Sequence, residues 1–297
     1  MKLDIEPSLL KSLLLLTSVV EARDPYTGGH LWRVAQFSKA LAESVGVERD
    51  TLFLATVGGY LHDLGKVAVP DAVLGKQGPL TDQEYAVIKT HPAVGCQLLG
   101  GHPLGALVVD AVGYHHERPD GRGYPDALDQ IPVVSCIIAI ADTFDAMTST
   151  RPYRDGMPIA KAASLLAGEG GKQFDGPLLD AFLKLANGGR LDHIVGHSDQ
   201  GRPLAVCDMC GPVVVMPRHS HDGDGVNCRV CGGKYIAHKA GDGFKLEGVG
   251  AVSGPAELTF FADEEQLDEV AHGRDGHVPG TISIEIPTWH TRRGIAQ

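Results

Sequence analysis

Two adjacent histidines, His115 and His116, follow an apolar stretch of helical character and precede a turn rich in glycine, proline and charge. A helix that ends in two imidazoles must place them beside partners, because a buried pair has four ring nitrogens to satisfy. Neutral imidazole is a good ligand for divalent transition metals. Polar packing at a helix end is the commoner explanation of such a pair, so the rest of the chain has to decide.

The first two predicted helices bring one further histidine inward. Residues 8–23 are expected to be helical up to the break before Pro25, because proline disfavours a helical residue in front of it. Residues 29–44 form the next predicted helix, in which His30, Val34 and Phe37 lie on one continuous face. A histidine at the head of an apolar face points inward, which favours a metal ligand over a surface residue.

A third predicted helix, over residues 50–64, ends in the pair His62 and Asp63. Adjacent helical residues diverge by about 100°, so His62 is expected to bind one ion while the two oxygens of Asp63 bridge to another. Gly58 and Gly59 lower helix propensity, and their presence predicts close packing against a neighbouring helix.

Two later helices complete the candidate set. Thr81 and Glu84 form a capping box at the start of a helix that delivers His91. Residues 131–145 form an apolar run that is read as a core helix, or alternatively as a central strand. A carboxylate inside such a run, Asp142, needs a cation, whereas Asp145 is suited to orient a ligand.

The seven candidate ligands mix nitrogen and oxygen donors without a thiolate. They are His30, His62, Asp63, His91, His115, His116 and Asp142. This set suffices for two divalent ions and suits iron or manganese, with zinc as a further candidate. Two such ions would share a hydroxide and activate it as a nucleophile.

Composition limits the partners of the chain. The 297 residues are 43% hydrophobic, ample for a core, and their net charge of −11 argues against a general nucleic-acid surface. An anionic substrate would therefore need metal ions and local cations. The leucine-rich run over residues 9–16 is too short to span a membrane, which predicts a soluble, cytoplasmic protein. Its helix is expected to be core or, alternatively, a dimer contact.

Several ordered motifs resemble the HD-GYP branch of the HD phosphohydrolases, over about residues 21–185. They are Asp24 to His30, His62 to Lys66, Thr90-His91-Pro92, His115 to Pro125, Ala141 to Ala146, and Arg151 to Arg154. The resemblance implies a mostly α fold, an all-α bundle of HD type, and a cyclic dinucleotide as substrate. Where some members have an acidic residue four positions before the first histidine ligand, this chain has Tyr26, which favours two ions over three.

The remaining roles follow from position and from this resemblance. Asp63 and Lys66 are the predicted catalytic residues. Lys66 would stabilise charge in the transition state or, alternatively, assist the leaving 3′-oxygen. Arg151, Arg154 and Arg122 are expected to hold phosphate, since arginine can donate two parallel hydrogen bonds. The turn Gly123-Tyr124-Pro125 is assigned to substrate recognition or pocket shaping, with a purely orienting turn as the alternative.

The predicted function is hydrolysis of cyclic di-GMP to linear pGpG, and whether a second cleavage to GMP follows is left open. Another cyclic dinucleotide or a nucleotide is an alternative substrate, because a metal site reads phosphate and not base. A further alternative is a binding protein that acts through its carboxy-terminal cysteines. Metal identity is also left open by the sequence.

Four cysteines predict a second metal site of a different kind. Two Cys-x-x-Cys pairs, each followed by glycine, supply Cys207, Cys210, Cys228 and Cys231. Four thiolates in this pattern resemble a zinc ribbon with one structural zinc. Two disulfides would fit a secreted protein better.

The chain is accordingly divided into a catalytic helical domain over residues 1–196, a zinc-ribbon-like unit over 197–243 and a small α+β extension over 244–297. Strands are expected at 213–216, 258–261 and 282–286, and a short helix at 264–271. No nucleic-acid or membrane partner is expected. A homodimer or a protein partner would use the first helix or the ribbon. Cys207→Ser is expected to release about one zinc ion and to loosen the carboxy-terminal unit without emptying the catalytic pocket.

Overall fold

A bundle of helices makes up most of the computed structural model, which describes residues 2–24, 28–76, 78–151, 154–252, 254, 262–272 and 282–285. The bundle begins with α1 (Pro7–Arg23), α2 (His30–Val45), α3 (Arg49–Leu61), α4 (Asp71–Leu74) and α5 (Asp82–Ile88). It continues with α6 (His91–Leu99), α7 (Gly105–Tyr114), α8 (Val133–Thr148), α9 (Ile159–Ala167) and α10 (Gly176–Asn187). The mostly helical class predicted from the sequence is confirmed, and the run over residues 131–145 is a helix, not a strand.

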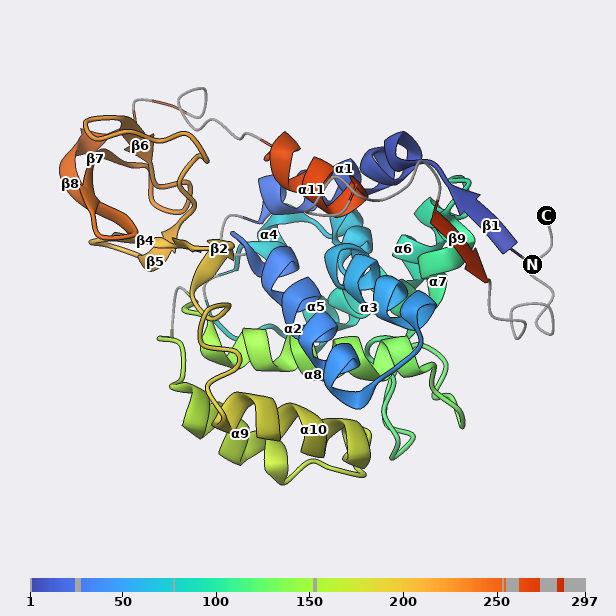
Figure 1. The fold of residues 1–297 in the computed structure, drawn as a ribbon. Coiled ribbons are helices and arrows are strands. Elements are labelled where there is room, and N and C mark those ends of the chain that lie inside the picture. Colours follow the sequence, from blue (N-terminus) through green and yellow to red (C-terminus); the bar gives the residue numbers. More distant parts are fainter. Residues whose placement is uncertain are drawn as a thin grey trace.

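The core lies where α2, α3, α7 and α8 pack together (Figure 1). The predicted inward face of α2 is confirmed, since Val34 and Phe37 are fully buried. The ring of Phe37 meets those of Phe144 on α8 and Phe182 on α10 edge to face, at centroid distances of 5.2 and 6.3 Å. This aromatic cluster joins the layer of α9 and α10 to the central helices.

Glycines bring α3 unusually close to its neighbours, as its sequence predicted. A Cβ on Gly58 would lie 2.4 Å from the Cβ of Ala111 on α7, and one on Gly59 would lie 2.6 Å from the Cα of Ala35 on α2. The α-helix ends at Leu61, earlier than predicted, and a 3₁₀ helix (Leu64–Ala68) follows.

The capping box predicted for Thr81 and Glu84 is confirmed, and the structure shows a second capped helix start at Asp175. Thr81 and Glu84 form the full capping box of α5, and the side chain of Asp175 accepts from the amide of Leu178 at the start of α10. These local hydrogen bonds satisfy amides that a helix leaves free at its first turn.

A group of short strands, called here the ribbon (residues 197–252), lies beside the bundle (Figure 1). It contains β2 (His197–Asp199), β3 (Arg202–Pro203), β4 (Ala205–Cys207), β5 (Gly211–Val214), β6 (Gly225–Asn227), β7 (Gly233–Ala240) and β8 (Gly243–Ala251). Strands β4 and β5 pair, and β6, β7 and β8 form an antiparallel sheet. The β7–β8 hairpin continues past residue 243, so the boundary predicted there falls at the first residue of β8 and divides the hairpin.

The carboxy-terminal elements return to the helical bundle. Helix α11 (Glu264–His272) packs on α1, and the Nζ of Lys11 lies 2.8 Å from the carboxylate of Asp268. Strand β9 (Ile282–Glu285) pairs antiparallel with β1 (Lys2–Ile5). The expected strand at 258–261 lies outside the described residues. No helix in the described part of the chain is long and apolar enough to cross a membrane.

Candidate metal centre

Three histidines at helix ends have their rings fixed in the same way. Each Nδ1 lies within hydrogen-bond distance of the backbone carbonyl three residues earlier. The pairs are His62 with Gly59 (2.9 Å), His91 with Ile88 (2.7 Å) and His115 with Val112 (3.0 Å). A carbonyl only accepts, so each Nδ1 carries the proton and each Nε2 presents a lone pair. This is the orientation that metal-binding histidines adopt.

His30, the first residue of α2, is fixed by a carboxylate instead. Its Nδ1 lies 2.7 Å from Oδ2 of Asp145, which is fully buried on α8. Asp145 therefore orients His30, in the role that its spacing from Asp142 suggested. The Nε2 of His30 lies 3.5 Å from a carboxylate oxygen of Asp63 and 3.5 Å from one of Asp142.

Asp63 lies between two groups of candidate ligands. Its Oδ2 is 3.5 Å from Nε2 of His30 and 3.4 Å from Nε2 of His62. Its Oδ1 is 3.5 Å from Nε2 of His91, whose Nε2 is in turn 3.2 Å from that of His115. One carboxylate therefore faces both groups with different oxygens.

All seven predicted ligands converge in this way. His30, His62 and Asp63 form one cluster of potential ligand atoms, and His91, His115 and His116 form another. Asp142 adds a carboxylate to the first, with its Oδ1 3.8 Å from Nε2 of His62. The helices that carry them are far apart in sequence and adjacent in the bundle.

Burial sets the protonation of the cluster. It lowers the pKa of His116 to about 3 and that of His115 well below its ordinary value, with help from neighbouring imidazoles. Burial opposes ionisation of Asp63, but Lys66 and His62 hold its pKa well below the usual range. His115 and His116 are therefore neutral beside an ionised carboxylate, which is the state that binds divalent cations.

The residues present fit two divalent ions. Nε2 of His62 is buried and has no hydrogen-bond partner among the described residues. The Nε2 atoms of His91 and His115 face one another although both rings already donate through Nδ1. Facing lone pairs repel, and a shared cation removes that repulsion. Six-coordinate iron or manganese suits this nitrogen and oxygen set.

Lys66 reaches the cluster from the 3₁₀ helix. Its Nζ lies 2.6 Å from Oδ2 of Asp63, and its side chain is 22% exposed. Burial alone would lower the pKa of Lys66, but the carboxylates of Asp63 and Asp142 raise it. The ammonium is therefore charged and lies at the open side of the ligand set.

The turn after the histidine pair is held by Glu117. This buried carboxylate accepts hydrogen bonds from the amides of Asp126, Ala127 and Leu128. Glu117 thus holds the backbone of the turn in place, and its described hydrogen bonds go to these amides and not to the histidines of the cluster. Gly123 packs so tightly on the turn that a Cβ there would lie 2.5 Å from the amide nitrogen of Arg118.

Tyr124 connects this turn to the cluster. Its ring stacks on that of His116, with centroids 4.7 Å apart and planes 24° from parallel. The peptide bond between Tyr124 and Pro125 is cis. The turn therefore fixes the orientation of a candidate ligand, whatever else it contacts.

The predicted phosphate-binding arginines do not converge as the metal-ligand candidates do. Arg151 and Arg154 pair with one another through their backbones, and the guanidinium of Arg154 donates to the carbonyl of Ala146 on α8. Arg122 is exposed, and its backbone amide donates to Asp120. None of the three guanidiniums makes a described contact with the ligand cluster.

Arg33 is an important residue that sequence analysis missed. It is 2% exposed and donates to both oxygens of Asp145, from Nε at 2.6 Å and from Nη2 at 3.1 Å. A cation three residues after His30 shares its helix face, so the sequence indicates that Arg33 points inward but not which residues it contacts.

The four ribbon cysteines also converge. Their four Sγ atoms all lie within 4.8 Å of one another, and Sγ of Cys207 is 3.5 Å from Sγ of Cys231. A tetrahedral zinc with bonds of about 2.3 Å spaces its sulfurs about 3.8 Å apart, so the arrangement fits one zinc ion. All six cysteines are unpaired by disulfides, and Gly211 and Gly232 adopt the positive φ that a tight turn after each pair requires.

Comparison with known proteins covers the helical part of the chain. Residues 15–178 match the HD domain family. A cyclic di-GMP phosphodiesterase response regulator, RpfG, from Xanthomonas campestris is 37% identical over 188 residues, which are 61% of this chain and 49% of the relative. A cyclic di-GMP phosphodiesterase from Thermotoga maritima is 36% identical over 61% of this chain and 50% of its own length.

A relative named for a different substrate matches at similar identity. A 3'3'-cGAMP-specific phosphodiesterase 2 from Vibrio cholerae is 36% identical over 57% of this chain and 33% of the relative. The solved structure of a cyclic GMP-AMP-specific phosphodiesterase from V. cholerae aligns with a TM-score of 0.46 and 18% identity, over 60% of this chain and 49% of that one. The chain spans about half the length of the first curated relatives it matches.

Proposed function

The chain belongs to the HD domain family, and we propose that it is a metal-dependent phosphodiesterase that hydrolyses a cyclic dinucleotide, with cyclic di-GMP as the first candidate. The observation that carries the proposal is Asp63, whose two oxygens face two separate groups of histidines. A pair of ions held in this way is a common arrangement for hydrolysing phosphate esters.

The proposed cofactors are two catalytic ions, iron or manganese, and one structural zinc. His30, His62 and Asp142 would hold one ion, His91, His115 and His116 the other, and Asp63 would bridge them. When bound, the ions supply a water nucleophile at neutral pH and neutralise phosphate charge. Cys207, Cys210, Cys228 and Cys231 would hold the zinc.

Lys66 is the proposed catalytic cation. Its charged Nζ lies at the open side of the ligand set, within 2.6 Å of Asp63. A phosphodiester undergoing attack gains negative charge on its oxygens, and a fixed ammonium nearby stabilises that charge. In this proposal Asp63 keeps Lys66 protonated and in place.

Substrate contacts are proposed for Arg151 and Arg154, for Arg122, and for the turn Gly123-Tyr124-Pro125. Arg154 is held against the carbonyl of Ala146, one turn of α8 beyond Asp142, so its cation lies on the helix that carries a candidate ligand. Arg122 is exposed, so its guanidinium is free to bind a phosphate of an incoming dinucleotide.

Cyclic di-GMP is preferred because the first relatives matched carry that substrate in their names, and the similar match to 3'3'-cGAMP enzymes makes that dinucleotide the principal alternative. The proposed product is linear pGpG, with GMP after a second cleavage. We also propose that the chain forms two units, the ribbon and the helical domain with α11 and β9 packed on it, and that the first helix or the ribbon contacts a second copy or another protein.

The test is anaerobic purification, metal analysis, and incubation with cyclic di-GMP, 3'3'-cGAMP and cyclic di-AMP, followed by chromatographic identification of products. We expect two catalytic ions per chain and conversion of cyclic di-GMP to pGpG. A fully loaded protein that cleaves none of the three dinucleotides would refute the proposed activity. Faster cleavage of 3'3'-cGAMP would replace the substrate and keep the reaction.

A further inference from the structure

We propose that the ribbon positions the catalytic metal ligand His30, so that an intact ribbon is needed for tight binding of the catalytic ions. This inference rests on the metal centre of the proposed function but not on its substrate. It departs from the sequence-based expectation that the ribbon and the catalytic pocket are independent.

The loop in front of His30 packs directly on the ribbon. A Cβ on Gly28 would lie 2.7 Å from the side chain of Val215, and a Cβ on Gly29 would lie 2.6 Å from the Cα of Ser198. Gly29 also has φ +70°, a conformation that favours glycine. The residue that precedes the ligand is therefore in backbone contact with β2.

Arg33 ties the same strand to the residue that orients His30. Its Nη1 donates to the carbonyl oxygens of Gly28 at 3.0 Å and His197 at 2.9 Å. Its Nε and Nη2 donate to Asp145, which in turn fixes Nδ1 of His30. A single buried guanidinium thus connects β2 to Asp145, the residue that orients His30. Moving His197 would leave an N–H group of Arg33 without its acceptor.

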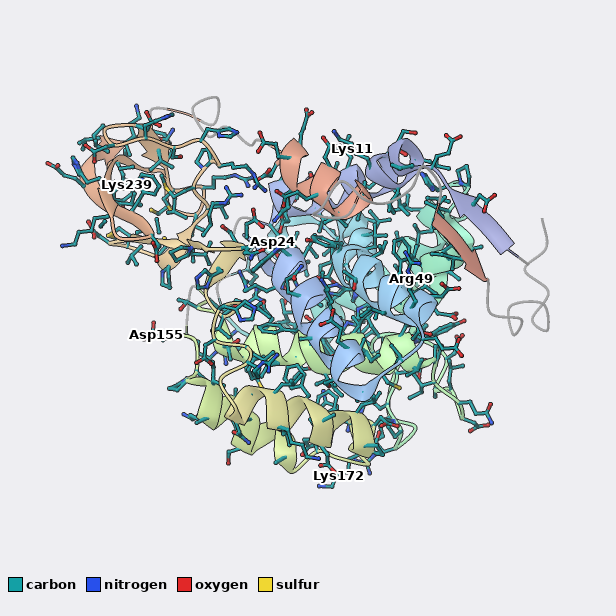
Figure 2. The ribbon with its side chains drawn as sticks, viewed as in Figure 1. Lys11, Asp24, Arg49, Asp155, Lys172 and Lys239 are labelled. Atoms are coloured by element: carbon teal, nitrogen blue, oxygen red, sulfur yellow. The ribbon has the colours of Figure 1, made fainter. Side chains whose placement is uncertain are left out.

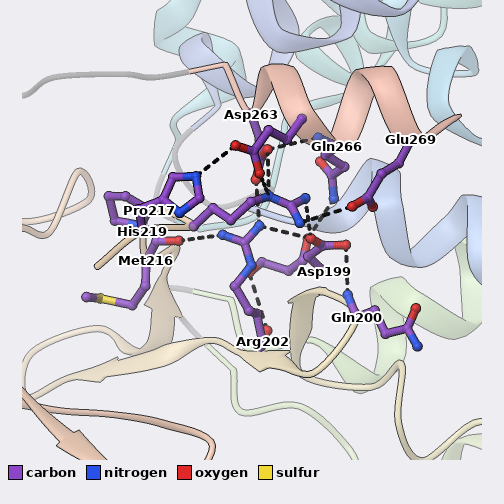
Figure 3. A network of polar contacts seen from close by, with 12 residues as sticks. Asp199, Gln200, Arg202, Met216, Pro217, His219, Asp263, Gln266 and Glu269 are labelled. Carbon is purple, nitrogen blue, oxygen red and sulfur yellow. Dashed lines mark hydrogen bonds and ion pairs between the residues drawn. The ribbon is translucent and has the colours of Figure 1, made fainter. Parts of the chain in front are cut away.

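A cluster of charges holds β2 in place. Asp199, 2% exposed, accepts from Arg202 at 2.9 Å and from Arg218 at 2.7 Å, and both arginines also reach Asp263 in front of α11 (Figure 3). Arg218 further contacts Glu269 on α11. Strand β2, which contacts Gly29 and Arg33, is therefore held by Arg202 and Arg218 of the ribbon, and the same arginines connect it to α11.

The zinc-site end of the ribbon makes a second attachment. Arg229 lies between Cys228 and Cys231, and its guanidinium donates to the backbone carbonyl of Ala22 in the last turn of α1. A cation is favourable at the carboxy-terminal end of a helix. Asp24, which follows that helix, lies where the ribbon meets the bundle (Figure 2). The ribbon therefore contacts both the carboxy-terminal end of α1 and the two glycines that precede α2.

The test compares Arg218→Ala and Gly29→Ala with the control Lys39→Ala. Arg218→Ala removes one holder of Asp199, and Gly29→Ala disturbs the contact with β2 from the catalytic side. Lys39→Ala removes an exposed ion pair with Glu43 on the same helix as His30. Mn²⁺ affinity is measured by calorimetric titration of metal-stripped protein whose retained zinc is verified by elemental analysis. Amide hydrogen exchange is followed over residues 28–33.

We expect Mn²⁺ to bind about tenfold more weakly to both test variants, a usual effect of losing support around a ligand, with faster exchange over residues 28–33 and no change in the control. Unchanged Mn²⁺ affinity in either variant that folds, as judged by circular dichroism, overturns the inference. Neither readout uses a nucleotide, so a failure of the proposed substrate leaves this result independent.

Discussion

Each histidine with a fixed ring presents Nε2 to the cluster because its Nδ1 already faces an acceptor. For His62, His91 and His115 the acceptor is a carbonyl of their own helical turn, so the helix end itself sets the orientation. For His30 the acceptor is a side chain, Asp145, which depends on a second residue for its own position. The orientation of His30 is therefore the feature of the centre that is most sensitive to substitutions far from it.

Substitutions of Lys66 and Asp63 should have different effects on metal binding and turnover. Lys66→Met removes a charge at the open side, so hydrolysis should slow by about a hundredfold or more while both ions stay bound. Asp63→Asn removes the carboxylate that faces both groups, so metal and activity should fall together. Elemental analysis beside steady-state rates measures both. Loss of the ions from Lys66→Met would show that Lys66 supports binding and not the reaction.

The pH dependence of metal-free stability is set by opposing histidine shifts. Burial lowers the pKa of His116 to about 3, so the unfolded chain binds the extra proton below pH 6.5 and stability falls as pH drops. Burial also acts to lower the pKa of His30, but Asp145 and Asp63 raise it to about 9, so its contribution is complete below pH 6.5 and is lost as pH rises toward 9.

The metal-free protein should therefore be most stable near pH 6.5. Each shifted group changes the free energy of unfolding by up to about 1.4 kcal/mol per pH unit. Urea unfolding from pH 5 to 9 measures the curve. In His116→Gln the free energy of unfolding should fall less steeply as the pH drops below 6.5. An equally steep fall in that variant would contradict the lowered pKa of His116.

At the scale of elements, helix α3 owes its close packing to Gly58 and Gly59. Gly59→Ala would place a Cβ 2.6 Å from the backbone of α2, so the helices must separate. Overpacking of this kind costs about 1–3 kcal/mol, and the urea midpoint should fall accordingly. Gly168→Ala is the matched control, because its Cβ would meet nothing closer than 3.7 Å. Equal midpoints for the two variants would refute the packing role.

Local signals were enough to predict several elements and the candidate ligands. The inward face of His30 and Phe37 and the capping box at Thr81 depend on residues close in sequence, and the structure has both. The end of α3 at Leu61 depends on a distant contact. Gly65 in the 3₁₀ helix lies so close to α6 that a Cβ there would be 1.8 Å from the carbonyl oxygen of His91.

The role of Arg33 could not be read from local pattern for the same reason. Its acceptor His197 is 164 residues away, and its other main acceptor, Asp145, is 112 residues away. Periodicity places Arg33 on the inward face of α2 but does not say what neutralises it. Support for a site that comes from a separate unit becomes visible only when the two units are in contact.

At the scale of the whole molecule, the chain has two hydrophobic cores. The large one is built from the helices together with α11 and β9, and among the described residues it includes none from the ribbon. The small one consists of ribbon residues such as Ala205, Val214 and Tyr235, with Cys207 and Cys228 within it. The two cores meet mainly through polar contacts of Arg33, Arg202, Arg218 and Arg229.

This separation predicts that loss of zinc spares the helical fold but not the precision of its metal site. Cys231→Ser removes an exposed candidate zinc ligand, so the zinc content should fall by about one per chain and the small core should open. The helical melting temperature, followed at 222 nm, should shift by less than about 4 °C because the large core is intact.

Mn²⁺ affinity should nevertheless fall in Cys231→Ser, since the ribbon contacts with Gly29 and Arg33 loosen with the small core. The control is Cys96→Ser, a half-buried cysteine in α6 that faces the carbonyl of Val109 and lies outside the ribbon. Loss of the helical transition in Cys231→Ser would mean that the two cores fold as one. A stable helical transition with weakened Mn²⁺ binding is expected only if the ribbon acts on the site through position, because no ribbon residue is among the proposed ligands of the catalytic ions.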